Sequence, residues 1–152
     1  MKAELELADA DGATSNPQVL LGDLQEALEM LARVEAVALG LARVLVIDDD
    51  ERLAELTARG LRRLGYDAES GSRFRLPRPR EIVVFDLGLA AGLSAGERAA
   101  LKVARPIVVT GATDGASRAV AASLGASEYL IKPVEPEILA AAISSRIADD
   151  RP

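Results

Sequence analysis

The second part of the chain alternates between short apolar runs and longer segments of mixed polarity. The runs are only a few residues long, are rich in β-branched residues and contain almost no polar position. Such runs are typical of strands that are covered on both faces, as in a parallel sheet. Strands are predicted at 44–47, 82–85, 107–109 and 129–131, and a weaker strand is predicted near 66–70.

The segments between these runs have helical spacing and typical helix ends. Ser94 and Glu97 have the spacing of a capping box, Gly125 suits a helix end, and Pro136 suits a first turn. Because strands that alternate with helices form parallel sheets with right-handed crossovers, the pattern predicts a doubly wound α/β domain over residues 42–149. The helices are predicted at 51–64, 94–104, 116–124 and 135–147.

A separate helical pattern precedes this domain. Four leucines recur at steps of three, four and three residues, which places them on one face of a helix. Asn16 and Pro17 suit the helix start, Gly22 moves the firm start to about Asp23, and Gly40 suits the end. The leucines are Leu21, Leu24, Leu28 and Leu31.

Residues 1–40 are therefore predicted to form an N-terminal extension, with a loose polar tail followed by a helix over about 17–39. The leucine face has two interpretations. It packs on the surface of the domain itself, or it pairs with a second copy of the chain in a homodimer.

The segment GSRFRLPRPRE, which precedes the strand at 82–85, interrupts the alternation of strands and helices. Its two closely spaced prolines argue against a regular helix. Its four arginines suit either a solvated loop or a contact patch for an acidic partner or a phosphate. They are Arg73, Arg75, Arg78 and Arg80.

Composition narrows the chemistry. The 152 residues carry a net charge of −6 and include no cysteine and no histidine, which excludes disulfides, thiolate metal sites and imidazole catalysis. No apolar run is long enough to span a membrane, and the N-terminus lacks the features of a signal peptide. The acidic balance argues against direct nucleic acid binding. We therefore expect a cytoplasmic protein that uses carboxylate, hydroxyl, lysine and arginine side chains.

Polar groups follow each of the confident strands. Asp48, Asp49 and Asp50 follow the first, and Asp86 follows the run at 82–85. Because ligands of doubly wound sheets bind at the carboxyl ends of the strands, these side chains are expected to converge. Two carboxylates 4 Å apart repel by roughly 4 kcal/mol at an effective dielectric constant near 20. A hard divalent cation, Mg²⁺ or Mn²⁺, would offset this repulsion, whereas Asp50 suits a helix cap alone.

Two further groups complete this set. Thr110 follows the third confident strand and Lys132 follows the last. A hydroxyl and a compact ammonium suit the oxygens of a phosphoryl group. Together with a nucleophilic carboxylate and a metal, they are the parts needed to form and break an aspartyl phosphate.

The motifs VLVIDDDE, IVVFDLGL, PIVVTGA and GASEYLIKPV, in this order, resemble the receiver domain of two-component response regulators over about residues 43–147. The resemblance implies a flavodoxin-like sheet of five parallel strands in the order 2-1-3-4-5, here with an extra N-terminal helix. It implies a cis peptide bond between Lys132 and Pro133. It also assigns a role to each of the site residues.

By this resemblance, Asp86 is the phosphoacceptor and a metal ligand. Asp48, Asp49 and the backbone carbonyl of Gly88 are the other metal ligands. Thr110 and Lys132 contact the phosphoryl group, and Tyr129 acts with Thr110 as the switch.

The implied function is a signalling module that receives a phosphoryl group from a histidine kinase or phosphotransfer protein and then binds a downstream protein. Such a module is not an enzyme, beyond catalysing its own phosphorylation and dephosphorylation. The chain ends soon after the last predicted helix, so we expect its output to come from partner binding. A homodimer through the N-terminal helix or through the last helix-strand-helix face is an alternative assembly.

Two other functions compete with this one. The first is a receiver fold that serves as a constitutive binding adaptor. The second is a Mg²⁺-dependent phosphatase with an aspartyl nucleophile, which Asp48 and Asp50 fit, although Arg52 stands where threonine or valine belongs.

The sequence departs from the family pattern in two places. The Arg/Pro segment replaces a helix, and Ala90 replaces a proline. In addition, the positions that control water access in this family hold the small residues Gly88 and Ala112, so we expect the aspartyl phosphate to hydrolyse quickly.

Overall fold

The structure of the protein is a computed structural model that describes residues 16–38 and 43–150, with the side chains of 16–31 and 43–150. The tail predicted before residue 16 and the helix end predicted at Gly40 lie outside the described residues. No described helix is both long enough and apolar enough to cross a membrane.

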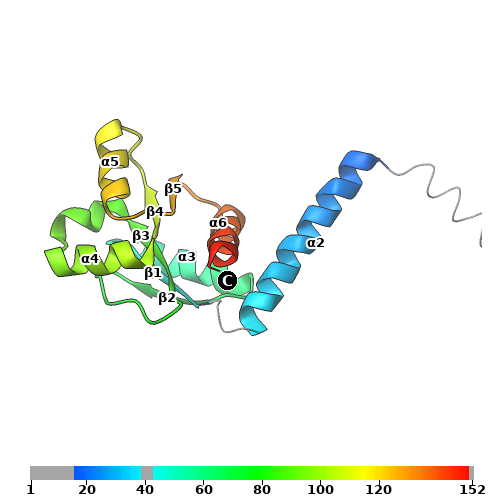
Figure 1. The fold of residues 1–152 in the computed structure, drawn as a ribbon, viewed down its shortest axis with the longest axis horizontal. Helices are drawn as coiled ribbons and strands as arrows, with labels where there is room; N and C mark the ends of the chain where they lie inside the picture. The colour runs from blue at the N-terminus through cyan, green and yellow to red at the C-terminus, as the bar shows by residue number, and fades with distance from the viewer. Residues whose placement is uncertain (1–15, 39–42, 151–152) are drawn as a thin grey trace, which may run out of the picture.

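Five parallel strands form one sheet in the order β2-β1-β3-β4-β5 (Figure 1). This order confirms the predicted flavodoxin-like fold class. The weak strand predicted near 66–70 is present at the edge of the sheet, one residue later than expected. The strands are β1 (Arg43–Ile47), β2 (Asp67–Gly71), β3 (Ile82–Asp86), β4 (Ile107–Thr110) and β5 (Glu128–Ile131).

Local sequence signals set most helix starts. Asp50 caps the helix that follows β1, and Ser94 and Glu97 form both hydrogen bonds of a capping box. A short 3-10 helix, η1, directly after β3 was not predicted, because its sequence LGLAAG has no helical periodicity. The helices of the domain are α3 (Glu51–Arg63), η1 (Leu87–Gly92), α4 (Ala95–Ala104), α5 (Gly115–Ser123) and α6 (Pro136–Asp149).

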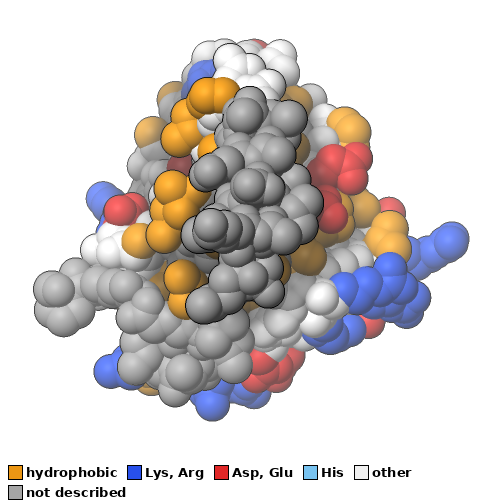
Figure 2. All heavy atoms as spheres, turned by 90° about the vertical axis from the view of Figure 1, so that its right-hand side faces the viewer, with side chains coloured by type: hydrophobic (Ala, Val, Ile, Leu, Met, Phe, Trp, Pro, Cys, Tyr) orange, Lys and Arg blue, Asp and Glu red, His pale blue; other side chains and the backbone are white. Residues whose placement is uncertain are grey.

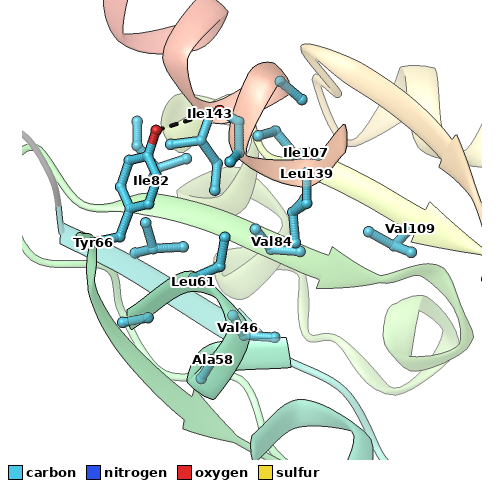
Figure 3. Packing of buried hydrophobic residues seen from close by; sticks show 14 of the residues in the cluster. Val46, Ala58, Leu61, Tyr66, Ile82, Val84, Ile107, Val109, Leu139 and Ile143 are labelled. Carbon is cyan, nitrogen blue, oxygen red and sulfur yellow. Dashed lines mark hydrogen bonds between the residues drawn. The ribbon is translucent and has the colours of Figure 1, made fainter. Parts of the chain in front are cut away.

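The helices cover both faces of the sheet, and the core therefore has two halves. On the face of α3 and α6, Val46 and Val84 pack with Leu61, Leu139 and Ile143 (Figure 3). The other half lies on the face of η1, α4 and α5, with Phe85 and Leu101 among its largest members. Burial on both faces explains why β1, β3 and β4 are apolar at nearly every position, whereas most positions of the edge strands β2 and β5 are exposed or half-buried.

The N-terminal helix α2 (Pro17–Ala38) lies beside the domain, and its last turns come close to α6 (Figure 1). The expectation that Gly22 delays the helix start to about Asp23 is wrong, because the helix begins at Pro17. Asn16 explains the early start, since its side chain accepts a hydrogen bond from the N–H of Gln18 at 2.9 Å. A side-chain cap of this kind stabilises a helix by about 1 kcal/mol, which offsets the similar cost of Gly22 inside the helix.

The Arg/Pro segment has no helix, as its prolines predict, and ion pairs hold it to the sheet. Both terminal nitrogens of Arg75 donate to the carboxylate of Glu81 at 2.8 Å. Arg75 and Arg78 also contact Glu69 on β2, each at 3.0 Å. Two of the four arginines are thus already paired within the chain, which weakens the hypothesis of a contact patch for a phosphate or an acidic partner.

Glu81 is the buried member of this network, with only 2% of its side chain exposed. Burial raises the pKa of its carboxyl, but hydrogen bonds from the Arg75 side chain and the Arg78 N–H outweigh burial and hold the pKa below the ordinary value of 4.5. The charged form is therefore favoured in the folded state, and the pair stabilises the protein fully above about pH 4.5.

Replacing Glu81 with glutamine is expected to lower the free energy of unfolding by about 2 kcal/mol at pH 7, because Arg75 then loses a buried charged partner. Urea denaturation measures the loss. The control is Glu69→Gln, whose exposed ion pairs are expected to contribute less than about 0.5 kcal/mol. The difference between wild type and Glu81→Gln should shrink as the pH falls below 4.5. An equal loss in both variants would contradict the assignment.

Candidate functional site

Three carboxylates meet at the carboxyl end of the sheet. Strands β1 and β3 are neighbours with Ile47 beside Phe85, so Asp48 and Asp86 follow paired positions. Oxygen atoms of Asp48, Asp49 and Asp86 all lie within 4.8 Å of one another. Asp48 and Asp86 are buried, whereas Asp49 is exposed. The structure thus brings together the acidic residues that the sequence predicted to converge.

Lys132 reaches this cluster from the end of β5. Its Nζ lies 2.8 Å from Oδ2 of Asp48 and 3.2 Å from Oδ1 of Asp86. The backbone positions it, because its N–H donates to the carbonyl of Thr110 at 2.8 Å. The Lys132–Pro133 peptide bond is cis, as the family resemblance implies.

The two aspartates keep Lys132 charged. Burial lowers the pKa of its ammonium, but the hydrogen bond to Asp48 and the negative charge of Asp86 outweigh burial and hold the pKa above its ordinary value. The group is therefore cationic throughout the neutral range. It offsets one of the three carboxylate charges and leaves the cluster with a net charge of −2, which a divalent cation would balance.

The donor chemistry of the cluster fits such a cation. Three carboxylates offer oxygen ligands only, which suits Mg²⁺ or Mn²⁺ and does not suit a metal that prefers nitrogen or sulfur. Asp50 is not part of this set, because its side chain accepts hydrogen bonds from the N–H groups of Arg52 and Leu53 and so caps α3. The interpretation of Asp50 as a helix cap is confirmed.

Gly88 lies directly against Asp86. Its N–H donates to Oδ1 of Asp86 at 3.4 Å. A Cβ atom at position 88 would stand 3.2 Å from Oδ2 of Asp86, which is closer than most Cβ contacts. Glycine therefore leaves room beside the predicted phosphoacceptor that any other residue would reduce.

Thr110 and Tyr129 are joined through Ala112. Thr110 is buried at the end of β4, one residue beyond Val109, the neighbour of Asp86 in the sheet. Its hydroxyl accepts a hydrogen bond from the N–H of Ala112 at 3.0 Å. The Tyr129 hydroxyl donates to the carbonyl of the same Ala112 at 2.6 Å. A displacement of Thr110 would therefore act on Tyr129 through one intervening residue.

Sequence reasoning missed two features around the site. The guanidinium of Arg118 on α5 lies 5.0 Å from the centre of the Tyr129 ring, which is within the range of a cation–π contact. A cavity of about 570 Å³ extends from Asp86 and Lys132 between α3 and α6 and is lined by apolar side chains such as Leu139. Neither feature has a local signal, since each depends on elements far apart in the chain.

No family model matches the chain. The photosynthetic apparatus regulatory protein RegA of Rhodovulum sulfidophilum is 30% identical over an alignment of 112 residues that covers 67% of this chain and 61% of RegA. The DNA-binding response regulator MtrA of Mycolicibacterium paratuberculosis is 32% identical over an alignment of 122 residues that covers 72% of this chain and 54% of MtrA. The chain therefore spans little more than half the length of these relatives.

Solved structures give the same result for the domain. A response regulator receiver domain protein from Clostridium thermocellum matches with a TM-score of 0.58 and 26% identity, covering 71% of this chain and 95% of that one. The chain carries a response regulator receiver domain. A response regulator from Burkholderia pseudomallei with a phosphorylated aspartic acid, a calcium ion and citrate matches this receiver domain with a TM-score of 0.50 and 28% identity. That match covers 70% of this chain and 69% of the other.

These likenesses confirm the family that the four sequence motifs indicated. In the receiver domain, Lys132 contacts Asp48 and Asp86, and Asp49 completes the cluster. Tyr129 and Thr110 are linked because the side chain of each forms a hydrogen bond with the backbone of Ala112. The roles of the individual residues stay predictions.

Proposed function

We propose that the receiver domain accepts a phosphoryl group from a histidine kinase or phosphotransfer protein onto Asp86. The observation that supports this proposal most strongly is the position of the Lys132 ammonium between Asp48 and Asp86, beside the exposed Asp49. Apart from an external donor and a metal ion, the chemistry of an aspartyl phosphate needs little else.

In the proposed reaction, an Asp86 carboxylate oxygen attacks the phosphorus atom of a phosphohistidine. The P–N bond breaks, and the imidazole leaves after taking a proton from the solvent. The 152 residues contain no histidine, so the phosphohistidine lies outside this sequence. Lys132 remains close enough to pair with the incoming phosphoryl oxygens. When bound at Asp48, Asp49, Asp86 and the Gly88 carbonyl, Mg²⁺ or Mn²⁺ would neutralise charge on the same oxygens.

Phosphorylation would then change a partner-binding surface. A phosphoryl oxygen on Asp86 can accept a hydrogen bond from the hydroxyl of Thr110, which would draw Thr110 toward Asp86 and strain the hydrogen bond that this hydroxyl accepts from the Ala112 N–H. Movement of Thr110 would disturb Ala112 and hence its hydrogen bond from Tyr129. The affected surface comprises α5, β5 and α6.

The proposed output is binding to a downstream protein target in the cytoplasm. The net charge of −6 makes a nucleic acid a poor direct target. The domain performs no reaction on a separate substrate in this proposal. It catalyses only its own phosphorylation and hydrolysis.

Treatment with acetyl phosphate and Mg²⁺, followed by intact-mass spectrometry, tests the proposal. A gain of one phosphoryl group, lost when Asp86 is replaced, supports it. An unmodified chain under conditions that phosphorylate another receiver domain would contradict it and favour a constitutive binding adaptor.

Ala112→Met is expected to lengthen the lifetime of the aspartyl phosphate several-fold, because a large side chain here restricts the approach of water to the phosphoryl group. Ala112 is suited to this test, since a side chain at Gly88 would crowd Asp86 itself. Loss of the phosphoryl mass over time gives the rate. Ala116→Met, on the exposed start of α5, serves as the control. Equal lifetimes in the wild type and both variants would show that water access at position 112 does not control the hydrolysis rate.

A further inference from the structure

Helix α2 carries an apolar stripe that its own domain does not cover. Leu21, Leu24, Leu28 and Leu31 are between 57% and 65% exposed, although the last turns of the helix lie near α6. Figure 2 looks at the side of the molecule where α2 lies and shows hydrophobic side chains gathered in a column there. The interpretation that this stripe packs on the domain itself is therefore wrong for these leucines.

The stripe is narrow and continuous. At about 100° per residue, the four leucines fall within an arc of about 80° along about 15 Å of the helix. Their spacing of three, four and three residues matches the a and d positions of a heptad repeat. The next position in this repeat is Glu35, so the apolar seam ends with Leu31.

The charges of α2 up to Leu31 lie away from this seam. Asp23, Glu26 and Glu29 are the charged residues between Asn16 and Leu31, and at helical spacing they lie about 120° to 180° from the centre of the stripe. The positions that flank a heptad seam hold uncharged residues such as Gln25 and Ala27. Two copies of the segment from Asn16 to Leu31 can therefore meet along the leucines without placing like charges across the interface.

The same acidic residues argue against a membrane surface as the binding partner of the leucine stripe. Helices that bind the surface of an anionic membrane carry lysine and arginine on their polar face, and the polar face of this segment is acidic. A two-fold axis, in contrast, brings each leucine stripe against an identical stripe, so the surface needs no complementary partner of a different sequence.

From this geometry we propose that α2 pairs with α2 of a second copy of the chain, along Leu21, Leu24, Leu28 and Leu31. The pairing is independent of phosphorylation, because the seam lies outside the receiver domain. Because the seam spans only two heptads, the dimer is a weak one that forms at micromolar concentrations.

Sedimentation equilibrium of the full chain from about 1 to about 100 micromolar tests the proposal. The wild type is expected to approach twice the mass of one chain within this range. Leu24→Glu with Leu28→Glu is expected to raise the dissociation constant about tenfold or more, since both leucines are central in the seam. Phosphorylation by acetyl phosphate and circular dichroism check that the domain and the helix are intact.

The matched control is Val19→Glu with Met30→Glu. These two residues are 58% and 60% exposed on the same helix, but helical spacing places them on the face opposite the leucines. This variant should dimerise like the wild type. Should Leu24→Glu with Leu28→Glu unfold α2, Leu24→Ala with Leu28→Ala keeps helix propensity and still removes two of the four leucines from the seam.

Several results would overturn the proposal. They are a wild type that stays monomeric at all these concentrations, a dimer that survives in the seam variants, and an equal loss of dimer in the control. A monomeric wild type that sediments with phosphatidylglycerol vesicles would also overturn it, in favour of a membrane as the occupant. Loss of the dimer in Asp86→Asn would refute its independence from the phosphorylation site.

Discussion

Asp86→Asn is expected to abolish covalent phosphorylation of the chain. The amide is isosteric with the carboxylate, but it has no anionic oxygen to attack phosphorus. Asp86 is also the buried carboxylate that lies against both Lys132 and Gly88, and it is the proposed acceptor. After incubation with acetyl phosphate and Mg²⁺, intact-mass spectrometry should show one added phosphoryl group on the wild type and none on the variant.

Asp50→Asn provides the matched control for this experiment. Asp50 lies in the same acidic run, but it caps α3, and asparagine is an equally good cap. Its phosphorylation should therefore equal that of the wild type. A phosphoryl group on the Asp86→Asn chain, or its loss in Asp50→Asn, would show that the acceptor has been assigned to the wrong residue.

Asp49→Asn is expected to make the chain more stable than the wild type without metal and less stable than the wild type with metal. Without metal, the variant should be more stable than the wild type by about 1 kcal/mol, because one of three crowded negative charges is gone. With Mg²⁺ or Mn²⁺, the wild type should gain stability through binding, whereas the variant should gain little. Its phosphorylation rate should fall about 100-fold, as should that of wild type after chelation.

Thermal unfolding with increasing Mg²⁺ or Mn²⁺ measures the first effect, and the rate of mass gain measures the second. Asp50→Asn is again the control and should respond to metal like the wild type. The reversal of sign separates loss of a metal ligand from simple damage to the fold, because a damaged variant would be less stable in both conditions. An unchanged metal response in Asp49→Asn would remove this residue from the ligand set.

Local signals in the sequence were sufficient for the order of the elements. The apolar runs predicted every confident strand, and the capping residues Asp50 and Ser94 predicted helix starts. These signals work because a cap or a buried run depends on residues only a few positions away. The early start of α2 at Pro17 shows their limit, since two local signals, Asn16 and Gly22, pointed to different starts and the stronger one prevailed.

The convergence of the acidic residues was also predictable, though for a different reason. Parallel strands place their carboxyl ends at one edge of the sheet, so Asp48 and Asp86 had to meet once the alternation of strands and helices was recognised. The chemistry of the site thus followed from the residue types at the strand ends together with one rule of topology.

The sequence by itself determined the elements, the fold class and the set of side chains at the sheet edge. Only the tertiary structure decided which distant groups pair: Lys132 with Asp48 across 84 positions, and Tyr129 with Ala112 across 17. It also decided that the leucines of α2 lie uncovered. Periodicity and capping are short-range effects, whereas ion pairs and uncovered surfaces depend on how distant elements pack.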